Sequence, residues 1–401
     1  MKKFVVMTLA AAAVVGCSKE NVKPGGEGAE SQKLNVLTSI QTKSAIDGVV
    51  MPVGSAIGVQ LTDATDNTKP FNGISSAQTG DGFYTDANNI RFINEAGANI
   101  WVSKAADGKD KLLMMTGANA GQVFAYYPYT ATVTNLGESA TVPVTIENTG
   151  EIDITGVTEN EGASGANGID KWPAVTAENE TDYLWHTPDD NMVSAQTTTT
   201  AKLNMNHALS RISLRVYTSN AAKNAVEGDA DSYYALVGYT IKNKANSSEL
   251  HAQFSGATMN IATGIIAGTT AGGEIQRTVK GYKMDKATAE EQETATGEAA
   301  KRVSNLLFPL TAIADDDTDG KSDNIELVLH IARVAGTTDI ADVDPATAVG
   351  YAIPFDVSTV KAWEAGKNYT YTIKFTGSSL SVESVTVAPW TETVGGNMDI
   401  M

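Results

Sequence analysis

Short runs of alternating apolar and polar residues recur along the chain, separated by clusters of glycine, asparagine and aspartate. The segment LNVLTSI places Leu34, Val36 and Ile40 in one phase, and AIGVQLT repeats the same alternation after a polar loop. Side chains on a strand point to opposite faces in turn, so this alternation predicts strands with one buried face. Thr, Val and Tyr favour strands as well. The chain is therefore expected to be mostly β structure.

Strands are expected in many further segments, which carry the same signals on both sides of a polar stretch near the middle of the chain. These segments are residues 98–103, 111–117, 121–129, 140–147, 202–218, 233–243, 249–264, 305–313, 325–334, 351–358, 367–377 and 380–390. Strand-rich halves of similar size predict an all-β fold with two β-sandwich domains in tandem.

Two polar stretches interrupt this pattern. Residues Asn148 to Glu180 are rich in glycine and acidic residues, which indicates a long surface insertion. Residues Thr187 to Ala201 are polar and are interpreted as the linker between domains. The predicted domains are accordingly an N-terminal sandwich over residues 34–195 and a C-terminal sandwich over residues 201–401.

The N-terminus has the pattern of a secretory signal peptide over residues 1–16. Two lysines precede an apolar run from Phe4 to Val15, which is shorter than the about 20 residues that span a bilayer. Small residues then precede Cys17, the only cysteine. The sequence VVGC resembles the bacterial lipobox, so Cys17 is expected to become the first mature residue and to carry a lipid. Residues 17–33, polar and glycine-containing, then form a flexible lipidated tether.

Charge and motif content exclude several classes of function. The formal net charge of −18 disfavours nucleic-acid binding, which depends on lysine and arginine to neutralise phosphates, so no nucleic-acid partner is expected. The sequence contains no P-loop, no dinucleotide fingerprint, no nucleophile elbow and no zinc-protease motif. The four histidines, His186, His207, His251 and His330, are too far apart for the usual zinc spacing. An enzymatic function is therefore not expected, and no cofactor is predicted apart from calcium.

One acidic segment, DDDTDGKSDNIE at residues 315–326, has the spacing of a calcium loop. Asp315, Asp317, Asp319, Gly320 and Glu326 occupy loop positions one, three, five, six and twelve. Alternate carboxylates can converge on one hard cation while the glycine makes the turn. The flanking segments are predicted strands, however, whereas an EF-hand needs helices on both sides. Calcium binding and an ordinary acidic hairpin loop therefore both remain open.

Several short motifs, taken in order, resemble the fimbrillin family, which builds type V pili on Gram-negative bacteria. They are the lipobox, an early strand followed by a loop with Lys43, the aromatic YYPY, the segment NHALSRISLRV and the late segment WEAGKNYTYTIKF. The resemblance implies two transthyretin-like β-sandwich domains and a structural, non-enzymatic role in adhesion. It also implies an outer-membrane lipoprotein precursor, acylated with chains such as palmitate, and a mature subunit in an extracellular fimbria.

The resemblance further implies a mechanism of assembly. A trypsin-like protease would cut between Lys43 and Ser44 and remove the first strand with its lipid. The groove that this strand leaves would then accept a C-terminal strand from another pilus subunit, in a homopolymer or a heteropolymer. Apolar donor candidates lie in the last residues of the chain: Val385, Val387, Trp390, Val394 and Ile400. An uncut anchor or a tip subunit would use only part of this mechanism.

A second hypothesis is a surface-anchored lipoprotein that binds a glycan or host ligand without polymerising. Its binding surface would use exposed aromatic side chains, with Tyr126, Tyr127, Tyr129, Trp172 and Trp185 as candidates, although the sequence YYPY favours core and turn positions over a ligand platform. Such a protein would keep its lipid and its first strand, whereas a polymerising pilin would lose both.

Overall fold

A computed structural model describes most of the chain. The described residues are 31–40, 51–96, 100–157, 174–178, 180–188, 192–218, 232–245, 247–250, 256–268, 272–284, 301–336 and 338–390. Cys17, Lys43, Ser44, Trp172, Val394 and Ile400 therefore lie outside the described residues.

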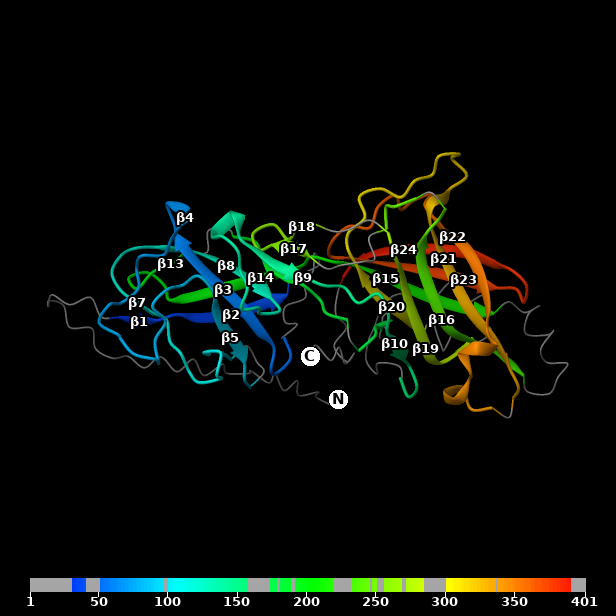
Figure 1. Cartoon of the computed structure of the whole chain (residues 1–401), viewed down its shortest axis with the longest axis horizontal. Helices are drawn as coiled ribbons and strands as arrows, with labels where there is room; N and C mark the ends of the chain where they lie inside the picture. The colour runs from blue at the N-terminus through cyan, green and yellow to red at the C-terminus, as the bar shows by residue number, and fades with distance from the viewer. Residues whose placement is uncertain are drawn as a thin grey trace, which may run out of the picture.

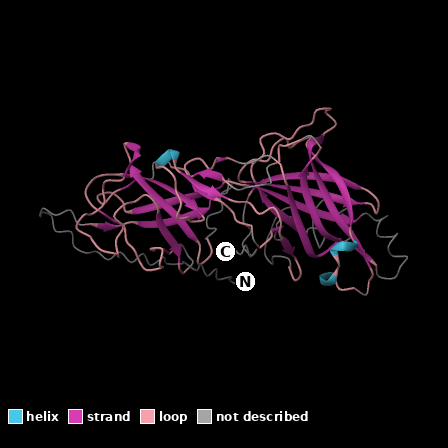
Figure 2. Cartoon of the chain, viewed as in Figure 1, coloured by secondary structure: helices cyan, strands magenta, loops and turns pink. Residues whose placement is uncertain are grey.

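The fold is all-β, as the sequence predicts. Within the described ranges the only helical turns are three short 3-10 segments, η1 (Gly137–Ser139), η4 (Ile340–Asp342) and η5 (Pro345–Thr347). In this part of the chain no helix has the length and apolar character needed to cross a membrane. The strands form two lobes that lie side by side (Figures 1 and 2).

The first lobe contains a nine-stranded sheet with the order β2-β14-β12-β8-β3-β5-β6, to which β13 adds beside β8 and β4 beside β3. The strands are β2 (Asn35–Ile40), β3 (Ala56–Asp63), β4 (Asp66–Pro70), β5 (Ile90–Asn94), β6 (Trp101–Ser103), β8 (Gly121–Tyr127), β12 (Leu184–His186), β13 (Met192–Val193) and β14 (Thr200–His207). A separate pair consists of β1 (Gln32–Lys33) and β7 (Met114–Met115).

The nine-stranded sheet curls so that its two ends meet. β2 and β6 are the end strands of the sheet path, yet residues of the two strands contact each other. The curled sheet encloses one apolar core, which includes Leu34, Val36, Ile57, Val59, Leu61, Phe92, Trp101, Val123, Leu203 and Met205. Ile57, Val59 and Leu61 belong to this core, as their common phase predicts, but Gln60 and Thr62 on the other face of β3 are also buried, so this strand is buried on both faces and not on one.

The second lobe contains two five-stranded sheets that share one core. One sheet has the order β10-β19-β16-β21-β22 and the other β11-β20-β15-β23-β24. The first comprises β10 (Glu151–Asp153), β19 (Glu274–Met284), β16 (Tyr233–Asn243), β21 (Lys321–Val334) and β22 (Val349–Asp356). The second comprises β11 (Ala174–Val175), β20 (Arg302–Leu307), β15 (Ser210–Thr218), β23 (Lys367–Phe375) and β24 (Leu380–Pro389). Within the shared core, Phe355 packs edge to face against Trp363 and against Tyr371.

A small three-stranded sheet lies at the junction of the lobes, with the order β18 (Ile266–Ala267), β17 (Ala257–Asn260) and β9 (Thr141–Val144) (Figure 1). Strand β8 connects the two cores. Its residues Val123, Ala125 and Tyr127 belong to the core of the first lobe, whereas Phe124 and Tyr126, on its other face, belong to the cluster that continues into the second lobe.

The expected insertion and linker differ from what the structure contains. Part of the glycine-rich stretch forms β10 and β11, which pair in parallel with β19 and β20, and Ile152 is fully buried. The expected linker contains β13 and the start of β14, and both belong to the first lobe. The boundary between residues 195 and 201 therefore does not separate the sheets, because the chain contributes strands to the second lobe before it completes the first.

Candidate functional site

The N-terminal strand β2 is the first candidate site, because it closes the curled sheet of the first lobe. Its residues pair in parallel with β14, from Asn35 opposite Thr200 to Ile40 opposite Met205. On its other side, within the described part of the chain, the main chain is hydrogen-bonded near its start, where the Leu34 N–H donates to the Leu113 carbonyl at 3.0 Å. Ahead of it, β1 pairs with β7. β2 is thus paired along its full length on one side only.

The side chains of β2 alternate between core and solvent. Leu34, Val36 and Thr38 are only 1%, 3% and 5% exposed, whereas Leu37 is 45% exposed. The predicted phase of Leu34 and Val36 is confirmed, and the side chain of Ile40 lies outside the described residues. Leu34 and Val36 are full members of the first core. The strand is therefore a structural part of the lobe.

Two polar contacts fix the end of β2, and sequence analysis missed both. The Trp101 indole Nε1 of β6 donates to the Thr38 hydroxyl inside the lobe at 3.1 Å. The Ser39 hydroxyl donates to Asn204 Oδ1 on β14 at 2.8 Å. Ser39 and Asn204 are also direct cross-strand partners. The adjacent residues Thr38 and Ser39 thus hydrogen-bond to the two strands on either side of β2, which are β6 and β14.

The C-terminal strand β24, which contains the donor candidates, is an edge strand. It pairs antiparallel with β23, and its side chains are partly or fully exposed, with Val385 partly buried and Val387 42% exposed. Trp390 differs, because its side chain is 1% exposed. Its main-chain N–H donates to the Gly366 carbonyl at 2.9 Å. The donor candidates therefore include both exposed edge residues and one buried anchor.

The anchor at Trp390 rests on the last residue of β14. The Trp390 and His207 rings stack with centroids 4.0 Å apart and an interplanar angle of 8°, and the Arg211 guanidinium lies 5.5 Å from the indole centroid. His207 Nδ1 in turn lies 2.7 Å from Asp182 Oδ2 in a fully buried pair. β14, the strand that pairs with β2, therefore ends at the residue on which Trp390 stacks.

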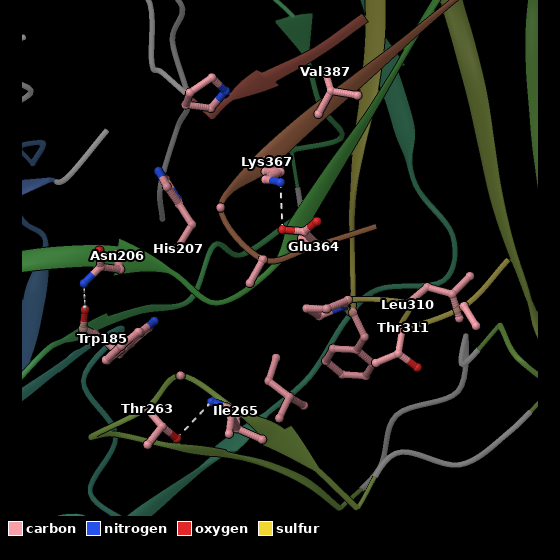
Figure 3. A pocket seen from close by; sticks show the side chains of 18 of the residues that line it. Trp185, Asn206, His207, Thr263, Ile265, Leu310, Thr311, Glu364, Lys367 and Val387 are labelled. Atoms are coloured by element: carbon pink, nitrogen blue, oxygen red, sulfur yellow. Dashed lines mark hydrogen bonds and ion pairs between the residues drawn. The ribbon is translucent and has the colours of Figure 1, made fainter. Parts of the chain in front are cut away.

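A cavity of about 970 Å³ lies at the junction of the lobes (Figure 3). Trp185 and Asn206 line it from the first lobe, and Leu310 and Lys367 line it from the second. The wall is mostly apolar, but the Glu364 carboxylate lies 2.7 Å from the Lys367 ammonium and raises the pKa of Lys367. A concave apolar wall with few polar groups is the usual form of a small-ligand site.

The aromatic candidates for glycan binding are mostly not on the surface. Tyr126 and Tyr127 are 0% and 2% exposed, so the interpretation of these two residues as core is confirmed and the alternative, an exposed binding surface, is wrong for them. Burial raises the pKa of Tyr126, whose hydroxyl bonds Asn89 and the Thr130 carbonyl. Tyr129 lies under the Arg91 guanidinium at 5.5 Å, and Trp185 borders the cavity. Trp185 is thus the one described candidate that lines a concave site.

The acidic loop brings together only part of the predicted calcium ligands. Oxygen atoms of Asp315, Asp317 and Asp323 lie within 4.8 Å of one another. Asp319 instead pairs with Lys321 at 3.1 Å, which lowers the pKa of Asp319, and Glu326 on β21 pairs with Lys242 at 3.3 Å. The loop leads directly into β21, so it lacks the flanking helices of an EF-hand, and calcium binding stays a prediction.

Comparison with known proteins identifies the family. A fimbrillin-like family model matches residues 48–390. The chain belongs to the fimbrillin-like family. No curated protein matches it.

Several solved structures are similar to this chain at low sequence identity. A candidate cell adhesion protein from Bacteroides ovatus is 16% identical, with 91% of this chain and 99% of that chain covered and a TM-score of 0.47. A fimbrial protein from Bacteroides vulgatus is 12% identical, with 90% and 100% covered and a TM-score of 0.47. The tip fimbrial protein Mfa3 from Porphyromonas gingivalis is 7% identical, with 84% and 95% covered and a TM-score of 0.31.

Proposed function

We propose that this fimbrillin is a structural subunit of a type V pilus that supports adhesion, and that it polymerises by strand exchange after its N-terminal strand is removed. The observation that carries the proposal is the position of β2, an end strand whose apolar side chains complete the core of the first lobe. In the sequence, Lys43 follows the last residue of this strand by three positions. Cleavage there separates the strand from the rest of the chain.

Removal of β2 creates a binding site for another strand. Leu34 and Val36 each leave an apolar hollow, and burial of one such aliphatic side chain contributes about 1.5–3 kcal/mol. β14 is left with unpaired main-chain groups along residues 200–205, which favour the addition of a new strand. Main-chain hydrogen bonds then supply affinity and alternate side chains supply register.

The donated segment comes from the C-terminal end of another subunit. β24 is suited to release because it is an edge strand, bonded to β23 on one side and largely exposed. The residues after Trp390 include Val394 and Ile400, which keep their place as donor candidates from the sequence. One end of each subunit would thus fill the groove of the next.

Before assembly, the subunit is a lipoprotein at the outer membrane. Acyl chains such as palmitate at Cys17 anchor the precursor, since each buried methylene adds about 0.8 kcal/mol to membrane binding. Cleavage after Lys43 removes this anchor together with β2. The role is structural rather than enzymatic.

Trypsin treatment of the recombinant mature chain tests the proposal. We expect a new N-terminus at Ser44 and, with time, heat-stable ladders on denaturing gels. A Lys43→Gln variant is the matched control, and it should remain uncut at this site and monomeric. The proposal fails if the cut chain still contains residues 34–40 after size-exclusion chromatography and forms no oligomers.

The cavity beside Trp185 favours a second candidate function, that of a surface-anchored lipoprotein that binds a glycan or host ligand. The two functions predict different mature proteins. A polymerising subunit recovered from cells begins at Ser44, whereas a lipid-anchored binding protein begins at Cys17. N-terminal sequencing of the native protein distinguishes them.

A further inference from the structure

The groove that holds β2, between β14 and β6, contains hydrogen-bonding groups that aliphatic side chains cannot pair with. Leu34, Val36 and Thr38 face the core in turn, so the third inward position carries a hydroxyl instead of an apolar group. That hydroxyl accepts a hydrogen bond from Trp101 Nε1, on a side chain that is only 7% exposed. When β2 leaves, this indole N–H loses its acceptor within an otherwise apolar groove.

We infer that the groove selects its incoming strand by a pair of hydroxyl residues that follows two aliphatic anchors. The inward hydroxyl satisfies Trp101, as Thr38 does, and the next residue satisfies Asn204 on the opposite face, as Ser39 does. The preferred pattern is aliphatic-x-aliphatic-x-hydroxyl-hydroxyl, read parallel to β14. This inference rests on the proposed strand exchange and names the chemistry of the strand that is accepted.

The selection follows from the cost of a buried donor without a partner. A valine at the Thr38 position has the same shape as threonine but no acceptor, so the Trp101 N–H would stay buried and unpaired. A serine there would keep the acceptor and lose only a methyl group. The hydroxyl pair also fixes register, because a shift of one residue turns every side chain to the opposite face.

The two possible registers of this chain's own C-terminal strand, β24, match the preferred pattern to different degrees. Leu380, Val382 and Ser384 have the spacing of Leu34, Val36 and Thr38, although the second hydroxyl is replaced by Val385. In contrast, a register that starts at Val385 places Pro389 at the first hydroxyl position, and proline offers neither a hydroxyl nor a main-chain N–H. The occupant we infer is therefore a strand of another subunit that carries two aliphatic anchors followed by two hydroxyl residues, and the segment from Leu380 to Ser384 meets this pattern at all but the last position.

The test measures peptide binding to the full chain after cleavage at Lys43 and removal of the released segment. The probe is a fluorescent peptide of residues 32–42, compared with Thr38→Val, Thr38→Ser, Ser39→Ala and Leu37→Ala versions. We expect Thr38→Val to weaken binding about tenfold and Thr38→Ser to weaken it much less. Leu37→Ala is the control, because Leu37 points to solvent.

A Trp101→Phe variant of the chain tests whether the weaker binding of the Thr38→Val peptide depends on the Trp101 indole N–H. In a Trp101→Phe chain the difference between the unmodified peptide and the Thr38→Val peptide should become smaller, while the effect of Ser39→Ala persists. Equal or tighter binding of the Thr38→Val peptide to the wild-type chain would overturn the inference. If Trp101→Phe does not fold, the comparison of Thr38→Val with Thr38→Ser on the wild-type chain still decides it.

Failure of strand exchange itself has a different signature. If the native peptide neither leaves nor rebinds, the proposed function fails, and selectivity is then measured by denaturation of the uncut chain. There, Thr38→Val should lower the denaturation midpoint more than Thr38→Ser does, and the difference should be larger when Trp101 is present. A Thr38→Val chain at least as stable as the Thr38→Ser chain would overturn the inference in this second measurement as well.

Discussion

Protonation of His330, in the second lobe, should affect the stability of the fold. His330 lies on β21, partly buried, with its Nε2 3.1 Å from the Thr240 hydroxyl of β16. Burial lowers the pKa of His330 below its ordinary value of 6.5, and Lys242 acts in the same direction while Glu274 opposes it. The folded protein therefore takes up the proton at lower pH than the unfolded chain does.

This shift predicts a loss of stability in mildly acidic solution. As pH falls through 6.5 toward the lower folded pKa, the unfolded chain binds a proton before the folded chain, so the free energy of unfolding decreases. Urea denaturation at about pH 7.5 and about pH 5.8, on either side of that ordinary value, should show a larger decrease for the wild type than for His330→Gln. An equal decrease in both proteins would contradict the assignment.

Residues differ in how far the sequence alone could place them. Leu34 and Val36 were placed correctly, because alternation along one strand is a local signal. The Trp101 to Thr38 bond joins residues 63 positions apart, and nothing in either segment indicates the partner. Glu180 ends an acid-rich stretch that predicts exposure, yet its carboxylate is buried against Arg277, 97 positions away. Burial of a charged residue depends on a partner that no local pattern contains.

At the scale of elements, β24 makes few stabilising contacts along its own length, because it is an end strand with mostly exposed side chains. One side of the strand is bonded to β23, and most of its side chains are exposed. Trp390, directly after the strand, contributes the large buried surface, through its stack on His207 and its contact with Arg211. The indole therefore acts as the anchor that keeps β24 on its sheet.

Loss of this anchor should release the strand. We expect Trp390→Ala to lower the free energy of unfolding by about 3–5 kcal/mol, the usual cost of truncating a buried tryptophan. We also expect faster amide hydrogen exchange over Leu380–Pro389. Val387→Ala is the matched control, since Val387 is 42% exposed and should change neither quantity appreciably. Unchanged exchange in β24 of the Trp390→Ala variant would show that another contact holds the strand.

The sequence predicted most of the strands but not their assignment to sheets. The alternation in KLNMNHALSRISLRVYT correctly predicts strand structure, and the segment covers most of β14 and all of β15. These two strands belong to different lobes, because β14 pairs with β2 and β12 while β15 pairs with β20 and β23. Pairing partners are distant in sequence, so a local pattern cannot supply them. The expected linker was misplaced for the same reason.

At the scale of the whole molecule, the two lobes share parts of the chain. The segment that contains β9, β10 and β11 leaves the first lobe after β8 and contributes to the junction and the second lobe before β12 returns. It also supplies Glu180, which pairs with Arg277 and accepts from the Leu306 N–H inside the second lobe. The second lobe is therefore incomplete without residues that precede the expected boundary.

This arrangement predicts the behaviour of fragments. A fragment of residues 201–401 lacks β9, β10, β11 and Glu180, so it should show no cooperative unfolding transition in calorimetry. Its Arg277 side chain, fully buried in the intact chain, would have no counter-charge, and breaking a buried ion pair in this way costs about 3–5 kcal/mol. A fragment of residues 137–401 restores these groups and is the matched control, and it should retain more folded structure. If the 201–401 fragment melted cooperatively at the temperature of the intact chain, the second lobe would be independent of the segment that crosses into it.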